Sequence, residues 1–586
     1  MANRGESEVL NENKSTYEHF RDHWNDCRDN SEKSHAYVLG KQWDDADIAA
    51  LEKANMPYLT KNIIIPVVNK LTGIERRNRT SLVVSPTEQG MEEVAWAMTR
   101  LNFHFANSSE MKWEYLLSYA FLLGIISDMG AYLRLTHSRV NDPFGTISMR
   151  VIPGFNILKD PHGRQYDLSE DKRVIYTTWW TVEEALSAYP DKAKEIAGLQ
   201  KYKSNIWGTL TRKTGERTDF RDDKKTTSEG RYRLIELWKL NRKVDSFYYD
   251  PFDQKKYRPE TLGDFEQLKF YNPQVMPMKT ESRSLECSVS FGENVILYSG
   301  PGDIQNGQHV FIPFYPYFMD GDLLGTVTPL RGYQDEHNKA GSSILHILNT
   351  QANSGWISEE GSVDREVLEN AAGSGVVIEY KGNKPDKIQP AILPAGEVFR
   401  DETSKRGVYE TSGLGENMMG RADSDRESGK LYGRRIEEGY QMLEQLFDNW
   451  ALTKELIGAR LIWMYQNKLS TEKIIQVLMQ EGKPETQAMD RMLAEEIVSN
   501  VNHGKYNVIS ENAARSATAK EREDTMLYQL SKVTPPDIVP WDEIWEAGGT
   551  PKMKRIAQKM REKLGVANEA QQALGALQQQ QAEQPQ

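Results

Sequence analysis

The spacing of hydrophobic and polar positions along this chain is helical near both ends and strand-like in the middle. In residues 1–60, apolar positions recur among charged ones, which predicts helices. Asp44 precedes the apolar positions Ile48 and Leu51, the pattern of a helix start. Pro57 then ends this helix, because proline cannot continue the backbone hydrogen-bond ladder.

The next segments are more apolar. Asn62–Glu75 contains a proline, which the first turn of a helix tolerates, so a helix is predicted from Pro66 onward. A basic stretch follows it, and then a short strand at Ser81–Ser85. Residues 90–135 predict two helices. Their most apolar part, Tyr115–Met129, is shorter than a membrane span and contains an acidic residue, so it is interpreted as a buried helix.

Between residues 145 and 330 the spacing changes to strands and turns, with a helix inserted at Val182–Tyr189. Ile312–Tyr317 is apolar and extended, because each proline restricts the residue before it. The predicted strands are Thr146–Ile152, Arg173–Trp180, Tyr232–Lys239, Val289–Phe291 and Asn294–Ser299.

After Arg331 the chain becomes helical again. Arg331–Gln351 predicts one helix and Pro394–Ser412 a second, more polar one. They bracket a short mixed insert at Trp356–Pro390, in which Val363–Asn370 predicts a helical turn and Gly375–Tyr380 a strand. The pattern by itself indicates a helical hairpin with an inserted subdomain.

A long amphipathic helix is predicted beyond the hairpin, continuing as helix over Leu452–Met479. Ala488–Asn507 predicts helix and then strand, and Ala513–Leu530 a charged helix. The Gln-rich end, Gln571–Gln586, is predicted to be disordered. The apolar face of the long helix would consist of Ile436, Tyr440, Leu443, Phe447 and Trp450.

These elements together predict an α+β fold that is mainly helical. The chain has 586 residues, enough for several domains. Its net charge is −12 and its pI about 5.6, whereas an open DNA-binding surface is usually basic. If the chain meets DNA, it is therefore expected to hold it loosely, as a conduit for sliding DNA would.

The sequence contains no motif that indicates catalysis or metal binding. Cys27 and Cys287 lack zinc-ligand spacing, and a reduced cytosolic state is expected for both. Gly415–Ala422 (GENMMGRA) has glycines at Walker spacing, but Arg421 and Ala422 replace the required Lys and Ser/Thr. No catalytic residue, cofactor or metal site is predicted. The carboxylate groups interpreted as solvated helix starts and turns are Asp44/Asp45/Asp47, Asp320/Asp322 and Asp423/Asp425.

Gly413–Gly429 stands apart as a long loop between helices. It contains Met418, Met419, Arg421 and Arg426 among glycines. Loops of this length are commonly functional or disordered, but an ordinary connection is the competing interpretation. The residues alone do not decide between a functional or disordered loop and an ordinary connection between helices.

Several blocks, in order along the chain, resemble the portal proteins of tailed bacteriophages, especially those of short-tailed phages. Each block is weak alone, and the ordered set is fairly specific. The blocks are LGKQW (Leu39–Trp43), NIIIPVVNKLTGIERRNRTSLVVSP (Asn62–Pro86), FLLGIISDMGAYLRL (Phe121–Leu135), VIPGFNILKDP (Val151–Pro161), GYQDEHNKAGSSILHIL (Gly332–Leu348) and GKYNVISENAARSATAKERE (Gly504–Glu523).

The resemblance implies a ring-forming subunit made of wing, stem, clip and crown. Its parts would be a wing over 1–330 with a strand-rich subdomain at 145–330, stem helices at 331–355 and 394–412, a clip at 356–393, a tunnel loop at 413–429, the long helix and rest of the wing at 430–508, a crown at 509–570 and the Gln-rich tail at 571–586.

The resemblance also implies the function. Twelve subunits would form the portal vertex of the virion, assemble in the host cytoplasm, and pass double-stranded DNA into and out of the capsid. No membrane contact is implied. The partners would be the large terminase subunit, a tail adaptor, and capsid and scaffolding proteins. The tunnel loop would present Met418, Met419, Arg421 and Arg426 to DNA, and the clip would contact terminase and adaptor through Trp356, Glu359, Glu360, Glu379 and Lys381.

Two other classes of protein remain as alternatives. A terminase or nuclease would need a Walker motif or a set of metal-binding carboxylates. Another ring or shell component, such as a tail adaptor or scaffold, would differ from a portal in the mass of its assembly.

Overall fold

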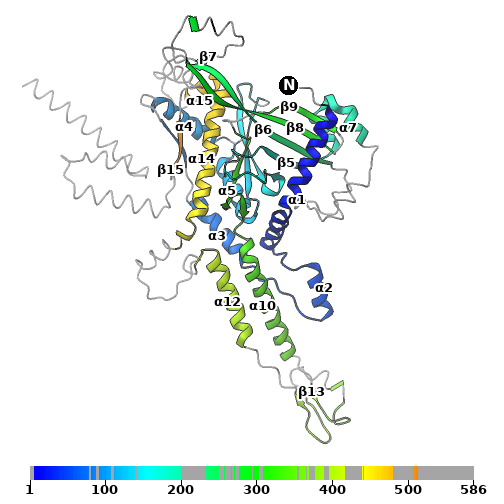
Figure 1. The fold of residues 1–586 in the computed structure, drawn as a ribbon. Coiled ribbons are helices and arrows are strands. Elements are labelled where there is room, and N and C mark those ends of the chain that lie inside the picture. Colours follow the sequence, from blue (N-terminus) through cyan, green and yellow to red (C-terminus); the bar gives the residue numbers. More distant parts are fainter. Residues whose placement is uncertain are drawn as a thin grey trace, which may run out of the picture. The chain divides into compact units, whose positions relative to one another are not determined.

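The structure is a computed structural model of the whole chain, and it combines helices and strands as an α+β fold (Figure 1). Predictions that fall outside the described residues include the helical part of Ala488–Asn507, the helix Ala513–Leu530 and the Gln-rich tail. The described residues are 5–77, 81–86, 92–106, 108, 111–139, 142–199, 232–249, 256–257, 266, 269–270, 276–292, 295–302, 308–352, 356–364, 366–367, 377–387, 395–415, 439, 441–479 and 506–511.

Contacts between residues divide the chain into two compact units. The first consists of Met1–Thr72 and Leu82–Ile509 and contains nearly all of the described elements. The second consists of Gly73–Ser81 and Ser510–Gln586, of which the structure describes only a few residues.

Helices form where the sequence places apolar positions three and four residues apart. The first buries Tyr17, Phe20 and Trp24 along one face. No helix of the described part is both long and apolar enough to cross a membrane. The helices are α1 (Glu6–Val38), α2 (Asp45–Lys53), α3 (Ile64–Arg77), α4 (Glu92–Ala106), α5 (Trp113–Ile126), α6 (Val182–Ala188), α7 (Ala193–Leu199), α10 (Arg331–Ala352), α12 (Ala395–Thr411), α14 (Glu444–Asn467) and α15 (Thr471–Met479).

The strands are mostly antiparallel neighbours in the region between α5 and α10. The largest sheet has the order β4-β5-β6-β8-β9, with β7 also paired to β6, and a second sheet has the order β10-β2-β3. Short two-stranded pairs are β1-β15, β11-β12 and β13-β14. The strands are β1 (Ser81–Pro86), β2 (Ala131–Ser138), β3 (Thr146–Pro153), β4 (Ile157–Leu158), β5 (Arg173–Trp180), β6 (Tyr232–Tyr249), β7 (Lys256–Tyr257), β8 (Met276–Phe291), β9 (Val295–Pro301), β10 (Phe311–Phe314), β11 (Tyr317–Met319), β12 (Asp322–Leu324), β13 (Trp356–Ile357), β14 (Asp386–Lys387) and β15 (Tyr506–Glu511).

The core lies between these sheets and the helices that cover them. α5 packs on β2 and β3, and its Phe121 ring stacks on Phe314 of β10 at 5.4 Å between centroids. Trp450 of α14 meets Phe314 edge-on at 4.7 Å. Such offset and edge-on aromatic pairs add about 0.5–1.5 kcal/mol each beyond the area that they bury. The helix after the hairpin is thereby fixed to the sheet region.

Several predicted elements have different ends in the structure. The second helix of residues 90–135 ends at Ile126, and β2 begins at Ala131. Between them the buried Asp128 Oδ1 accepts hydrogen bonds from Gly325 N at 2.8 Å and Thr328 Oγ1 at 2.7 Å. The helix thus ends just before a buried carboxylate whose hydrogen-bond donors come from residues 325–328. β6 in turn runs past the predicted end at Lys239 to Tyr249, because β8 pairs with it from Leu234 to Tyr249.

The prediction of one continuous helix over 436–479 is wrong in two places. A turn at Leu443 precedes α14, and residues 468–470 separate α14 from α15. Ser470 Oγ accepts a hydrogen bond from Lys473 N at 3.3 Å, so its hydroxyl caps the second helix. Leu443 and Trp450 are buried and Phe447 is partly buried, whereas Ile436 and Tyr440 lie outside the described residues.

A cluster of polar groups is buried beneath the sheets, around the segment that follows β4. Lys159 and Asp171 are fully buried, and Asp160 N donates to Asp171 Oδ2 at 3.1 Å. His309 Nε2 donates to the Asp171 carbonyl at 2.7 Å. Burial raises the pKa of Asp171 to about 7, although the nearby Lys159 opposes the rise. Burial lowers the pKa of His309 to about 4.

These two groups have opposite effects on stability between pH 4 and pH 7. The pKa of Asp171 is higher in the folded than in the unfolded state, so its contribution to stability is present at low pH and is lost as the pH rises toward 7. The pKa of His309 is lower in the folded state, so its contribution is present above about pH 6.5 and is lost as the pH falls toward 4. In the wild-type protein the two slopes partly cancel.

We therefore expect opposite changes from two substitutions. Relative to wild type, the free energy of unfolding of Asp171→Asn should rise between pH 4 and pH 7, because the His309 slope is no longer offset. That of His309→Gln should fall over the same interval. Each difference should be on the order of 1–3 kcal/mol. Urea unfolding at several pH values measures both, and curves parallel to wild type would contradict the assignment.

Candidate functional site

The helical hairpin of α10 and α12 lies at the place where the sequence predicted two helices around an insert. The two helices pack side by side (Figure 1). A Cβ atom on Gly407 would lie 2.6 Å from the Tyr333 ring, so only glycine allows this approach. The buried residues of α12 are only Ser404, Val408 and Tyr409. The hairpin therefore has a narrow contact, and most of its side chains remain available to solvent or to partners.

An extended segment, residues 58–63, lies along α10 and is called the strap here. Its backbone pairs with α10 side chains at regular intervals: Leu59 N donates to Ser342 Oγ at 2.9 Å and Lys61 N to Asn338 Oδ1 at 2.9 Å. Ile63 N donates to Gln334 Oε1 at 2.9 Å.

The spacing of these bonds has a geometric reason. Four residues of an α-helix rise about 6 Å, and two residues of extended chain about 6.6 Å. Every fourth side chain of α10 therefore meets every second backbone amide of the strap. Gln334 also donates through Nε2 to the Lys61 carbonyl at 2.8 Å. The helix supplies the partners that a neighbouring strand would otherwise provide.

Asn338 is the centre of this network. Its Oδ1 accepts from Lys61 N and from Gln334 Nε2, and its Nδ2 donates to Gln42 Oε1 at 2.6 Å. Gln42 in turn donates to the Tyr37 carbonyl at 2.9 Å. Asn338 and Gln42 are both buried. Residues of three sequence blocks that carry the portal resemblance thus meet here: Gln42 from 39–43, Ile63 from 62–86, and Gln334 and Asn338 from 332–348.

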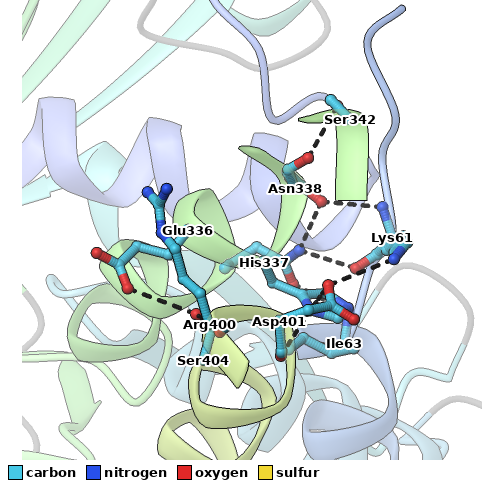
Figure 2. A network of polar contacts seen from close by, with 10 residues as sticks. Lys61, Ile63, Glu336, His337, Asn338, Ser342, Arg400, Asp401 and Ser404 are labelled. Atoms are coloured by element: carbon cyan, nitrogen blue, oxygen red, sulfur yellow. Dashed lines mark hydrogen bonds and ion pairs between the residues drawn. The ribbon is translucent and has the colours of Figure 1, made fainter. Parts of the chain in front are cut away.

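A charged group joins the strap to α12 (Figure 2). Asp401 Oδ1 lies 2.9 Å from His337 Nδ1 and 3.3 Å from Lys61 Nζ. Burial lowers the pKa of His337, while the charge of Asp401 opposes this change. A Cβ atom on Gly341 would lie 2.7 Å from Lys61 Cε, so the lysine side chain reaches Asp401 across a glycine. This carboxylate therefore connects three separate segments.

The described part of the insert between the helices has little core of its own. Its described strands are β13 and β14, joined through Trp356↔Lys387 and Ile357↔Asp386. The strand predicted at Gly375–Tyr380 is wrong for its described part, 377–380, which is not in a strand. Val377 and Tyr380 are 79% and 50% exposed, so no sheet in the described part of the insert covers them. An apolar, β-branched run needs a partner surface before it becomes a strand.

The predicted clip residues lie on this insert without forming one cluster of contacts. Trp356 is partly buried, and Glu359 Oε2 accepts from Asn383 Nδ2 at 3.3 Å. Glu360 and Glu379 are exposed. Lys381 is also exposed, and its backbone N donates to the Ser362 carbonyl at 2.9 Å. The exposed carboxylates and ammonium suit polar docking contacts.

The predicted tunnel-loop residues Met418, Met419, Arg421 and Arg426 lie outside the described residues, which resume at 439 after 415. Among the residues that the structure describes, His, Cys, Asp and Glu side chains form no group of three that could hold a metal ion. Cys27 and Cys287 are both free thiols. The polar strap network was missed from the sequence, since Gln334 and Asn338 have the spacing of an ordinary solvated helix face.

Comparison with known proteins identifies one family. The family model described as phage P22-like portal protein matches residues 14–586. A search of curated proteins found no match.

The network around Asn338 makes a prediction about stability. Asn338→Ala should lower the free energy of unfolding by roughly 2–4 kcal/mol, because buried partners on Lys61, Gln334 and Gln42 lose their hydrogen bonds. Asn349→Ala is the matched control, since Asn349 is exposed on the same helix. Its effect should stay within about 0.5 kcal/mol. Urea unfolding of both variants checks this, and equal losses would exclude the role given to Asn338.

Proposed function

Because the chain belongs to the phage P22-like portal protein family, we propose that it forms the ring at the portal vertex of the virion through which double-stranded DNA enters and leaves the capsid. The observation that carries this proposal is the family match over residues 14–586. The family is one of structural phage proteins, not of enzymes. We propose a ring of twelve subunits assembled in the host cytoplasm, with capsid and scaffolding proteins around it.

The described geometry supports assigning the hairpin to the stem of this ring. α10 is tied to the strap by buried amides and to α12 by Asp401. Side-chain hydrogen bonds of this kind fix the direction in which a helix leaves the body of a protein. In the proposed ring, copies of α10 and α12 stand around the channel, and residues 1–330 and 430–508 form the wing. Residues 413–429 are the proposed tunnel loop and 509–570 the crown.

The insert at 356–393 is the proposed clip. A small subdomain with few buried residues cannot be stable alone, so neighbouring copies would complete it. Its exposed Ile357, Val377 and Tyr380 would then be covered in the ring. Its charged residues, among them Glu360 and Lys381, would remain on the outer end to bind the large terminase subunit during packaging and a tail adaptor afterwards.

Charge supports loose contact with DNA. Twelve copies at −12 each would carry a formal charge of −144. A wall of this sign repels phosphates and limits stalling of the moving duplex. Arginines of the proposed tunnel loop, Arg421 and Arg426, would touch the backbone without reading sequence.

The mass of the purified assembly tests the proposal. Native mass spectrometry or electron microscopy should show a closed ring of about twelve copies of the 67.1 kDa chain. A monomer or a shell would overturn the portal function. A clear ATPase or nuclease activity of the pure protein would favour a DNA-processing enzyme instead.

A second experiment tests the proposed tunnel loop. Replacing Arg421 and Arg426 together by Glu should impair DNA packaging or retention, because like charges would face the phosphates. Ring assembly should be unchanged. Packaged DNA per particle, measured beside the ring mass, separates these outcomes. If the variant no longer forms the ring, the loop is structural.

A further inference from the structure

The helix α4 has large apolar side chains on two opposite faces. Val94, Met98 and Phe105 are buried on one face. Trp96 and Phe103 lie on the opposite face, where they are 55% and 48% exposed. At 100° per residue these two positions are only about 20° apart, so both rings lie along one line of the helix. A helix that is apolar on opposite faces is normally covered on both.

Trp96 and Phe103 are called the outer face of α4 here. The inner face is already occupied by α14, because the Tyr465 ring stacks on Phe105 at 5.6 Å between centroids. The Tyr465 hydroxyl also donates to Asn102 Oδ1 at 2.9 Å. The described elements that pack on α4 therefore leave its outer face open to another segment.

Residues 480–505, which lie outside the described residues, begin and end near α4 and are called the connector here. At its beginning, the connector follows α15, which packs against α4. At its end, the connector leads into β15, which pairs with β1. β1 is itself bonded to α4, since Val84 N donates to Thr99 Oγ1 at 3.0 Å. Asn102 Nδ2 donates to the Leu82 carbonyl at 3.2 Å. α4 and the connector belong to the same compact unit of the chain.

The sequence of the connector contains an apolar row of suitable length. Met489, Leu493, Ile497 and Val501 recur every four residues, which is the spacing of one face of a helix. A helix over these residues would be about 18 Å long, whereas the outer face of α4 spans only about 10 Å. The row is therefore long enough to cover both exposed rings.

The rest of the connector is long enough to bring this row to the outer face. Extended chain spans roughly 3.3 Å per residue, so residues 480–488 reach about 30 Å and residues 502–505 about 13 Å. A helix with its side chains is about 10–12 Å across, so both spacers can pass around α4. A segment tethered at both ends is present at an effective concentration on the order of millimolar. This favours the connector over a partner that is free in solution.

We propose that the connector of each subunit covers the outer face of its own α4. Its apolar row packs as a helix on Trp96 and Phe103, which gives the two rings the apolar partner that the described elements do not supply. The same contact holds the connector in place between α15 and β15. The inference goes beyond the proposed ring, because the contact lies within one subunit.

Crosslinking of the full-length chain tests the contact directly. A chain carrying Phe103→Cys and Ile497→Cys, treated with a short thiol-specific crosslinker, should give the crosslinked peptide pair in mass spectrometry. A denaturing gel should show no band at twice the mass of the chain. The matched control is Phe399→Cys with Ile497→Cys, because Phe399 is 70% exposed on α12, far from α4 in Figure 1. Wild-type protein is the blank for Cys27 and the buried Cys287.

Two results of this experiment would overturn the proposal. Crosslinks between chains would assign the outer face of α4 to a neighbouring copy. A lack of the crosslink, although both introduced cysteines react with a maleimide, would show that the connector packs elsewhere.

Limited proteolysis gives an independent measurement. Trypsin cleavage after Arg491, within the apolar row, should be at least about tenfold faster in Trp96→Ala/Phe103→Ala than in wild type. The reason is that loss of two covered rings raises the population in which the connector is open. Tyr115→Ala/Tyr119→Ala removes two exposed rings of α5 and should leave the cleavage rate unchanged. Equal rates in all three proteins would refute the role of α4, whether or not the chain forms a ring.

Discussion

Backbone groups that a neighbouring element covers need hydrogen-bond partners, and the partly buried strap finds them without belonging to a sheet. It lies along α10, where Gln334, Asn338 and Ser342 replace the ladder of a neighbouring strand. The match depends on the near-equal rise of four helical and two extended residues. Because each bond has a fixed register, the strap can pair with α10 in one position only. This register therefore sets the direction of α10 relative to the strap.

Polar contacts are well suited to such a junction. Apolar packing tolerates sliding of one surface over another, whereas a buried amide loses its partner as soon as the register changes. Asp401 adds a polar contact of the same kind to α12, since its carboxylate pairs with both His337 and Lys61. The described part of the insert, at the other end of the hairpin, has few buried residues. A rigid base with a weakly supported end suits a subunit that we propose is completed only by its neighbours.

The core around the sheets is held by apolar packing more than by polar contacts. Aromatic stacking of Phe121, Phe314 and Trp450 fixes α5 and α14 to the sheets. Beside it, Lys159, Asp171 and His309 are buried as a polar cluster whose members favour different protonation states. α2 stands at the other extreme, with no buried residue at all. Burial is therefore concentrated in the body, and α2 contributes little to it.

Local periodicity determined much of this protein from the sequence alone. The strand at Arg173–Trp180 and the helix that begins at Arg331 lie where the pattern placed them, because the spacing of apolar positions that marks each element is set by residues only a few positions apart. The ordered motifs also indicated the family. The tertiary structure decided which segment packs against each face of a helix or strand. Gln334 and Asn338 have the spacing of a solvated helix face, yet they are buried against a strap more than 270 residues earlier in the chain. Val377 and Tyr380 belong to an apolar run typical of a strand, yet in the described part of the insert no sheet covers them. Burial depends on the partner that the fold brings to a surface, and a local pattern carries no information about that partner.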